Sequence, residues 1–276
     1  MTFDLQNGDC LQLMKKIPDK SVSMILADLP FGTTKAHWDH PVPLDKLWKQ
    51  YERIIKDNGV IALWAQSPFD KTLACSNMKL YRYEWIIQKT RPTGFLNAKK
   101  MPMKAHENVL IFYKSLPTYH PQMTHGHERK VSTAYQKRNS KKTECYGDYG
   151  LTTYDSTDRY PLDVLKFKWD TQTSKGHSAQ KPVAACEYFI RTYTDPGDTV
   201  LDNVMGYGST AIAAYNTGRK FIGMELDKEI FNSALLRISI QTGKTIKELT
   251  GEVQKSEREN AGSKGAGEAV LDMRQV

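Results

Sequence analysis

The chain has 276 residues, of which 39% are hydrophobic and 25% charged, and its formal net charge is +8. This length suits one large α/β domain or a domain with an insertion, and the basic balance suits a polyanionic partner, although basic soluble enzymes are also common. No apolar run approaches the roughly 18 residues that span a bilayer, and the N-terminus lacks the apolar segment of a signal peptide. The four cysteines form no C-x-x-C pair, so we expect reduced thiols in a cytoplasmic protein and no metal site.

The first part of the chain alternates short apolar runs with amphipathic segments. A helix is predicted at 44–59, because apolar residues recur there at helical spacing and Asn58-Gly59 supplies a stop. A second helix is predicted at 67–78, with Ser67 as its N-cap and Pro68 in its first turn. Strands are predicted at 2–6, 21–28, 60–64, 81–89 and 107–114. This alternation indicates a mostly parallel, doubly wound α/β sheet.

The composition changes between residues 115 and 176, where aliphatic residues become sparse and polar, aromatic and basic residues dominate. Ten Lys and Arg residues stand there against seven Asp and Glu residues. We interpret this segment as an inserted module with little core of its own. A solvated, partly disordered excursion is the alternative.

The α/β pattern returns at Lys181. A helix is predicted from Pro182, followed by a strand, a turn containing Gly206 and Gly208, and a helix that begins near Ser209. A strand at 220–225 and an amphipathic helix at 228–243 complete the pattern. Beyond Gly243 the sequence is polar and dotted with glycine, which predicts a fraying helix or a loose tail.

The glycine turn predicts a site for an adenosyl group. Glycine lets the backbone approach a ligand, and the N-terminus of the following helix presents oriented N–H groups. Glu225 ends the next strand, where an acid can accept hydrogen bonds from both ribose hydroxyls. The third glycine of a dinucleotide fingerprint is replaced by Ala211, and Asp202 precedes the turn. An acid suits a cofactor with an ammonium group, which favours S-adenosylmethionine over a dinucleotide.

Two more acids are predicted at the carboxyl edge of the sheet, where ligands bind in such folds. Asp28 follows the strand at 21–28, and Asp9 follows the strand at 2–6. The alternative for Asp9 is an N-cap on the helix that follows it. The loop HSAQKP, residues 177–182, could contact a cofactor carboxylate through its His, Gln and Lys side chains, or could be a plain polar linker.

Five motifs together give the chain a resemblance to a known family. They are GDC…IPDKSVSMILADLPFG, HENVLIFYK, HSAQKP, VLDNVMGYGST and FIGMELD, in this order and with the basic segment before HSAQKP. The sequence resembles the β-class amino-group DNA methyltransferases, whose catalytic half precedes the cofactor half. The resemblance covers residues 1 to about 240. It implies a catalytic half at 1–114, a target-recognition insertion at 115–176, a cofactor half at 177–242 and a polar tail at 243–276.

The resemblance also implies a Rossmann-like sheet of seven strands with one antiparallel strand. The catalytic residues it implies are Asp28, Pro30 and Phe31. The cofactor S-adenosylmethionine is then expected to contact Asp9, Cys10, Asp28, Lys181, Asp202, Gly206, Gly208, Ser209, Thr210 and Glu225. DNA is expected to contact Thr33, Lys35, Arg129, Lys130, Lys137, Arg138, Lys141 and Lys142. The sequence departs from the family pattern at Leu29, Phe31, Asn203, Val204 and Tyr207.

The tetrapeptide that begins at Asp28 suits methylation of an exocyclic amine. A carboxylate and a backbone carbonyl can accept its two N–H groups, and a ring beside the acid can stack on a base flipped out of the duplex. Asp in this position favours adenine in this family, and a cytosine amino group is the alternative. Methylation at carbon-5 of cytosine is disfavoured, since no proline precedes a cysteine.

Two other functions are alternatives to this one. The chain could methylate RNA or a protein amide, or it could be a DNA-binding relic without activity. The insertion argues against the first alternative, and the intact acids and glycines argue against the second. The partners expected are double-stranded DNA, a second copy of the chain and a companion restriction endonuclease, in the cytoplasm of a bacterium or encoded by a phage.

Overall fold

The computed structural model describes residues 2–32, 36, 39–133, 153–168 and 180–251. The chain forms two compact units, one of residues 1–120 with 163–276 and one of residues 121–162. The smaller unit lies inside the segment 115–176, and the larger unit contains the remainder of that segment. None of the helices in the described ranges combines the length and the apolar character that crossing a bilayer requires.

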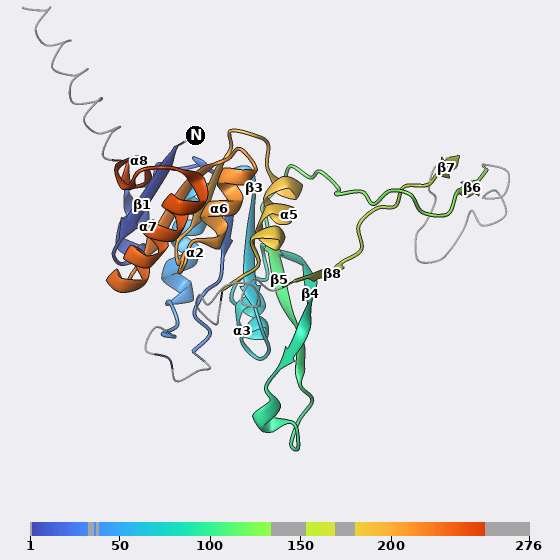
Figure 1. Cartoon of the computed structure of the whole chain (residues 1–276), viewed down its shortest axis with the longest axis horizontal. Coiled ribbons are helices and arrows are strands. Elements are labelled where there is room, and N and C mark those ends of the chain that lie inside the picture. The colour runs from blue at the N-terminus through green and yellow to red at the C-terminus, as the bar shows by residue number, and fades with distance from the viewer. Residues whose placement is uncertain (1, 33–35, 37–38, 134–152, 169–179, 252–276) are drawn as a thin grey trace, which may run out of the picture. The chain divides into compact units, whose positions relative to one another are not determined.

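The larger unit is built on an eight-stranded sheet in the order β1-β10-β9-β2-β3-β5-β4-β8 (Figure 1). Only β5 is antiparallel to its neighbours β3 and β4, and the other described pairs are parallel. The predicted Rossmann-like fold with one antiparallel strand is thereby confirmed. The strands are β1 Phe3–Asn7, β2 Val22–Ala27, β3 Ile55–Ala65, β4 Tyr81–Thr93, β5 Lys104–Phe112, β8 Val164–Phe167, β9 Thr199–Asp202 and β10 Lys220–Glu225.

The expectation of seven strands was wrong, because β8 adds an eighth in the segment that was expected to be insertion. It pairs in parallel with β4, where Ile86 stands opposite Val164, and the Ile86 N–H donates to the Asp163 carbonyl at 2.8 Å. Pairing with β8 satisfies backbone N–H and C=O groups on that side of β4, and it leaves a four-residue strand at the edge of the sheet.

Two sets of helices cover opposite faces of this sheet (Figure 1). Side chains alternate along β2, so that Met24 and Leu26 face one helical layer while Ile25 and Ala27 face the other. The first layer contains α5 Val183–Tyr193, α6 Ser209–Asn216, α7 Lys228–Thr242 and α8 Ile246–Thr250. The second contains α1 Cys10–Leu13 with the 3-10 turn η1 Met14–Lys16, α2 Leu44–Ile54 and α3 Phe69–Ser76.

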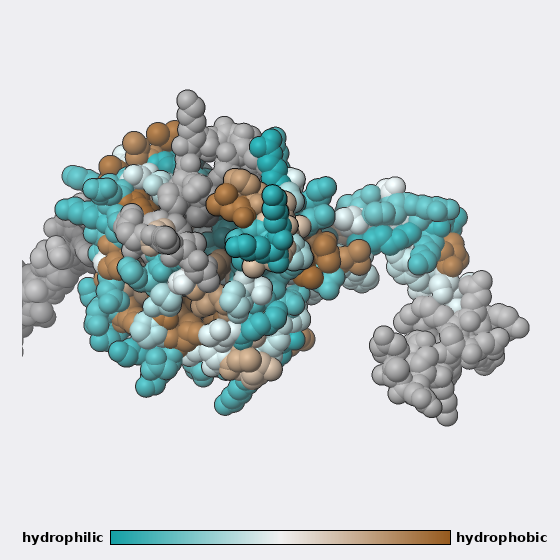
Figure 2. Space-filling view, turned by 90° about the horizontal axis from the view of Figure 1, so that it is seen from below, coloured by the Kyte–Doolittle hydropathy of each residue, from teal (hydrophilic) through white to brown (hydrophobic). Residues whose placement is uncertain are grey.

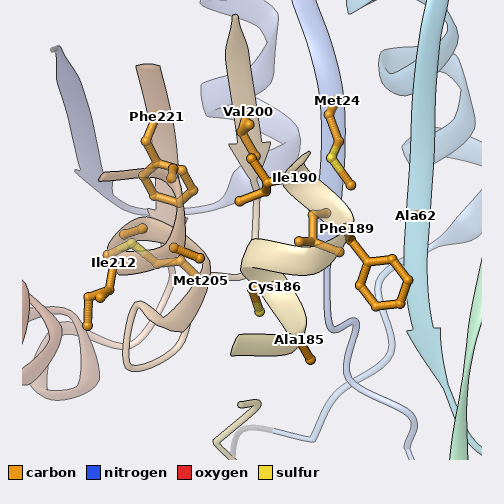
Figure 3. Close-up of a cluster of buried hydrophobic side chains, with 14 of the residues drawn as sticks. Met24, Ala62, Ala185, Cys186, Phe189, Ile190, Val200, Met205, Ile212 and Phe221 are labelled. Atoms are coloured by element: carbon orange, nitrogen blue, oxygen red, sulfur yellow. The ribbon is translucent and has the colours of Figure 1, made fainter. Parts of the chain in front are cut away.

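The first layer is centred on α5, whose Phe189 and Ile190 project toward the sheet (Figure 3). Phe189 is fully buried, and its ring contacts the rings of Trp64 and Trp85 edge to face. This packing holds α5 against the sheet. Because α5 begins two residues after Lys181, it also restricts where the Lys181 side chain can lie.

The boundaries of two predicted helices differ from those observed. The helix predicted at 44–59 ends at Ile54, and Asn58-Gly59 lies within β3, whose pairing with β2 shifts register between Val22 and Met24. The irregular pairing absorbs the residues that would otherwise form a turn. The helix predicted at 67–78 is α3, and its N-cap is Pro68 rather than Ser67.

The beginning of the predicted polar tail is ordered. Helix α8 starts with a capping box between Thr245 and Glu248, and Leu249 is fully buried against the first helical layer. One apolar side chain at the right spacing is therefore enough to dock this turn. Residues 252–276 of the predicted tail lie outside the described residues.

Strands β4 and β5 extend beyond the rest of the sheet as a long hairpin closed by the 3-10 turn η2 Phe95–Asn97 (Figure 1). Hydrophobic side chains near its end are exposed, among them Phe95, Leu96 and Met101. Figure 2 views the molecule from the side toward which the hairpin points, and hydrophobic and hydrophilic side chains lie side by side there.

The smaller unit holds a two-stranded antiparallel sheet of β6 Lys130–Ser132 and β7 Tyr154–Ser156. Arg129 forms a two-bond ion pair with Asp155, and Thr124 pairs with Arg159 in an isolated bridge. Among the described residues of this unit no hydrophobic side chain is buried. Hydrogen bonds and ion pairs therefore hold these residues together.

Candidate active site

A cavity of about 840 Å³ lies at the carboxyl ends of the parallel strands in the larger unit. Residues that follow β1, β2, β3, β9 and β10 line it, together with β4 and the segment before α5. Loops leave parallel strands at the same edge of a sheet, which is why ligands in such folds bind there. The cavity therefore collects side chains from both ends of the sequence.

Asp202 and Glu225 occupy one part of this cavity. Asp202 ends β9 with 4% of its surface exposed, and it accepts a hydrogen bond from the Thr210 hydroxyl at 2.7 Å. Glu225 ends β10, and its two carboxylate oxygens accept from the Gly206 and Asp227 N–H groups, each at 3.0 Å. The glycine turn is thus tied to the acid that follows it by 19 residues.

Burial governs the ionisation of both acids. The pKa of Asp202 rises to about 7, mainly because burial disfavours the charge, while the bonds from Thr210 and the Val204 N–H oppose the rise. Burial also raises the pKa of Glu225, and backbone donors including Asp227 and Gly206 counteract it. A cation that enters beside Asp202 would favour its ionised form.

The two predicted glycines have different surroundings. Gly206 lines the cavity with a φ of +50°, and a Cβ added there would meet no atom within 4 Å. Gly208 has a φ of +77° and is not among the residues that line the cavity. A Cβ at Gly208 would lie 2.6 Å from the side-chain end of Ile238 of α7, and its left-handed φ would strain any other residue, so local backbone geometry accounts for this glycine. Gly206 is the one that leaves space for a ligand.

The N-terminus of α6 borders the cavity next to this turn. Ser209 and Thr210 line the cavity, and both are largely buried. Arg237 of α7 donates to the Tyr207 carbonyl at 2.8 Å and to the Ser209 hydroxyl at 3.3 Å, which anchors the turn. The first N–H groups of a helix are available to a ligand, since they have no partner within the helix.

Asp9 and Cys10 lie where β1 meets α1, and both line the cavity. Asp9 is also the N-cap of α1, because its carboxylate accepts from the Leu11 N–H at 2.7 Å. The capping role named as its alternative is therefore real, and it does not remove the side chain from the cavity. Burial raises the pKa of the Cys10 thiol, with a hydrogen bond to Asn203 opposing the rise.

Asp28 lies at the end of β2, and it forms an ion pair with Lys181. The Lys181 ammonium is 2.7 Å from Asp28 Oδ2 and 3.1 Å from Glu107 Oε2. Glu107 Oε1 is in turn 2.7 Å from the ammonium of Lys89. Asp28 Oδ1 is buried and has no hydrogen-bond donor among the described residues. One oxygen of this carboxylate is held by Lys181, and the other is a buried acceptor without a donor among the described residues.

These charges set each other's ionisation. Burial raises the pKa of Asp28, and the adjacent Lys181 ammonium works against the rise. Burial would also raise the pKa of Glu107, but the ammonium groups of Lys181 and Lys89 together lower it. The two carboxylates raise the pKa of Lys181 in spite of its burial, so the lysine remains charged.

Phe31 and Pro30 line the cavity beside Asp28. Phe69 of α3 stacks on the Phe31 ring with centroids 5.2 Å apart, and Lys181 Nζ lies 5.8 Å from that ring's centroid. Leu29, which departs from the family pattern, is 2% exposed and packs in the hydrophobic core of the second helical layer. A buried leucine therefore anchors the segment that carries Asp28 and Phe31.

The lysine predicted to contact the cofactor, Lys181, lies beside the predicted catalytic acid. Glu107 and Lys89 were not predicted as site residues, although HENVLIFYK was recognised as a motif. An acid at the start of a buried apolar strand is a signal that could have found Glu107, because buried charges are almost always paired. Asp39, Arg91 and Thr93 also line the cavity without having been predicted.

The predicted DNA contacts are mostly outside the described residues. Thr33, Lys35, Lys137, Arg138, Lys141 and Lys142 lie there, and Arg129 and Lys130 lie in the smaller unit. Within the described part of the chain, no three His, Cys, Asp or Glu side chains are grouped to hold a metal ion.

The chain is similar to several known proteins. A family model described as DNA methylase matches residues 22–236. The chain is 26% identical over 262 residues to the DNA adenine methyltransferase YhdJ of Escherichia coli (strain K12), covering 88% of this chain and 85% of that protein.

Two solved structures share the fold. The complex of M1.HpyAVI with SAM has a TM-score of 0.56 at 21% identity and covers 85% of this chain and 99% of that one. The cytosine-N4-specific PvuII DNA methyltransferase has a TM-score of 0.59 at 16% identity, with 91% and 94% covered.

Asp202→Asn is expected to stabilise the protein at alkaline pH. A carboxyl group whose pKa is raised in the folded state favours folding at low pH, and this contribution is lost as pH rises through about 7. The difference from the ordinary value of 3.8 corresponds to roughly 4 kcal/mol. Urea unfolding across pH should show the variant gaining on the wild type above pH 4 and levelling off above about 7. A gain that is the same at all pH values would contradict the assignment.

Proposed function

This chain belongs to the DNA methylase family whose model matches residues 22–236, and we propose that it transfers a methyl group from S-adenosylmethionine to the exocyclic amino group of adenine in duplex DNA. The observation that carries the proposal is the carboxylate of Asp28 at the cavity edge. Lys181 holds one of its oxygens at 2.7 Å, and the other has no donor among the described residues.

The cavity fits S-adenosylmethionine. Asp202 is a buried acid that can pair with the ammonium group, and Glu225 ends a strand where it can accept from ribose hydroxyls. Gly206 leaves the turn open to a ligand, since no atom lies within 4 Å of the place its Cβ would take. When bound, the cofactor supplies an electrophilic methyl group on a cationic sulfonium.

Asp28 orients the amine. The exocyclic nitrogen of adenine is a weak nucleophile because its lone pair is delocalised into the ring. Asp28 Oδ1 accepts one N–H, and a backbone carbonyl of the same segment accepts the other, which turns the lone pair toward the methyl group. The protein thus acts by positioning and by stabilising the positive charge that develops on the nitrogen.

Phe31 holds the base. A base must leave the duplex before its amino group can reach a cavity at the sheet edge. The Phe31 ring lines that cavity and is supported by Phe69 on one side. Stacking of a base on an aromatic ring contributes about 1–3 kcal/mol, which helps to offset the cost of flipping.

Cytosine amino groups are the second candidate substrate. The cytosine-N4-specific enzyme shares this fold with a TM-score of 0.59, so the fold accommodates either base. Adenine is preferred because the relative YhdJ is named a DNA adenine methyltransferase and because Asp28, rather than Ser, begins the tetrapeptide.

The function is tested by incubating the purified protein with radiolabelled S-adenosylmethionine and duplex DNA, RNA or a protein mixture in separate reactions. Label on the amino group of adenine in duplex DNA is the expected result, and sequencing of methylated bases then gives the recognition site. Label only on cytosine would establish the second candidate. Label only on RNA or protein would overturn the proposal.

Asp28→Ala is expected to lower methyl transfer by at least about a thousandfold, since the amine loses its acceptor. Binding of S-adenosylmethionine, measured by calorimetry, should change by less than about tenfold, because Asp202, Gly206 and Glu225 remain. The matched variant Asp202→Ala should instead abolish cofactor binding. Near-normal turnover in Asp28→Ala would refute the catalytic role of this carboxylate.

Duplex DNA is expected to bind partly through Arg129 and Lys130 of the smaller unit, with affinity that falls steeply with salt. Each phosphate contact releases condensed counterions, so Lys130→Ala should reduce the slope of log affinity against log salt by about 1. Lys220→Ala is the control. Lys220 is the first residue of β10, and the cavity lies at the opposite end of that strand. An unchanged slope in Lys130→Ala would remove this residue from the DNA interface.

A further inference from the structure

Four charged side chains form a chain of alternating sign that begins at Asp28. The separations are 2.7 Å from Asp28 to Lys181, 3.1 Å from Lys181 to Glu107 and 2.7 Å from Glu107 to Lys89. The last three side chains are 8–11% exposed, whereas 29% of the Asp28 side chain is exposed. The proposed methyl transfer uses only Asp28 and Lys181 of these four residues, and it gives no role to Glu107 and Lys89.

Burial makes such a chain costly unless every charge has a partner. Moving an isolated ammonium or carboxylate out of water costs desolvation free energy. Removal of one partner of a buried ion pair therefore leaves the other as an unpaired buried charge. The four charges sum to zero when all are ionised. Because apolar residues at such positions are often equally or more stabilising, stability alone does not account for this network.

Each member comes from a different part of the fold. Asp28 follows β2, Lys89 lies on β4, Glu107 lies on β5 and Lys181 precedes α5. The Lys181 ammonium also lies 5.4 Å from the centroid of the buried Trp64 ring, which limits its freedom on another side. Glu107 therefore occupies the position from which a carboxylate can hold a flexible lysine against Asp28 Oδ2.

We propose that Glu107 and Lys89 are positioning residues, which hold the Lys181 ammonium against Asp28 Oδ2 and so reserve Asp28 Oδ1, in its ionised state, for the substrate amine. This proposal deepens the proposed function and rests on it for the identity of the amine. Glu107 divides the attraction of Lys181 between two carboxylates. Lys89 balances Glu107, so that Lys181 is not drawn away from Asp28.

The two residues act on Asp28 in opposite directions. The Glu107 carboxylate raises the pKa of Asp28 and the Lys89 ammonium lowers it, in addition to the larger effects of burial and of Lys181. The Asp28 carboxylate in turn contributes to the raised pKa of Asp202, which also lines the cavity. The remaining titratable or charged groups that line the cavity near these elements include Asp9, Cys10, Asp39, His40, Arg91 and Glu225. None of these is altered in the variants below.

The test compares Glu107→Gln, Lys89→Met and the double variant, each as the full chain. The protonation of Asp28 is followed in the free protein by infrared spectroscopy with carbon-13 in the aspartate carboxyl groups. Asp28→Asn identifies the band. Glu107→Gln should move the Asp28 midpoint to lower pH and Lys89→Met should move it to higher pH, each by roughly half a pH unit or more.

The double variant should return the midpoint close to that of the wild type, because it removes one charge of each sign. Methyl transfer to duplex DNA is then measured across pH in the same proteins. The acid limb of kcat/KM, which reports groups in the free enzyme, should follow the infrared midpoints. In both single variants kcat should be lowered about tenfold or more, with the KM for DNA little changed. If Glu107 and Lys89 had a purely structural role, the two single variants would lose activity, but the acid limbs of their pH profiles would not move in opposite directions.

The control is Asp57→Asn, which breaks the exposed ion pair with Lys20 at the start of β3, away from the cavity. It should leave the Asp28 midpoint and the pH profile unchanged. Midpoints that move in the same direction in both single variants, or that do not move, would overturn the proposal. Absence of methyl transfer in the wild type would overturn the proposed function alone, since the infrared midpoints are measured without substrate.

Discussion

The ion pair between Lys181 and Asp28 joins the two halves of the site. Asp28 follows the second strand of the chain, and Lys181 precedes the helix that leads to the glycine turn. Their contact at 2.7 Å places the end of β2 beside the beginning of α5. Phe189 buries α5 against the sheet and thereby keeps the lysine in reach of the acid. Hydrophobic packing of α5 thus places Lys181 where it can form the ion pair with Asp28.

A second constraint is the common edge of the parallel strands. Asp28, Asp202 and Glu225 each end a strand, and the sheet order brings β2, β9 and β10 next to one another. Three acids in one cavity repel each other, and burial adds to the cost of charging Asp202 and Glu225. A cationic cofactor relieves part of that repulsion. The repulsion among these carboxylates destabilises the free protein, and the same negative charges favour binding of a sulfonium and an ammonium group.

Local patterns predicted the elements that packing does not rearrange. The apolar strand before Asp28, the glycine turn and the acid at 225 all follow rules of spacing that operate within about 25 residues. The same rules failed at Asn58-Gly59, where strand pairing overrides the turn preference, and at β8, which pairs with β4, a strand far from it in the sequence. The assignment of Gly208 to the cofactor stays a prediction, and the structure adds that this glycine also lies against Ile238 of another helix.

The sequence by itself determined the family, the fold class and which acids end the strands, because strand ends and glycine turns are set by neighbouring residues. Tertiary structure alone decided that Lys181 pairs with Asp28, that Glu107 and Lys89 extend this pair, and that Leu29 is buried. These contacts join β2, β4, β5 and the segment before α5. The order of the strands decides which charged side chains lie next to one another, and their burial decides that each must be paired. Neither property can be read from residues that are neighbours in the sequence.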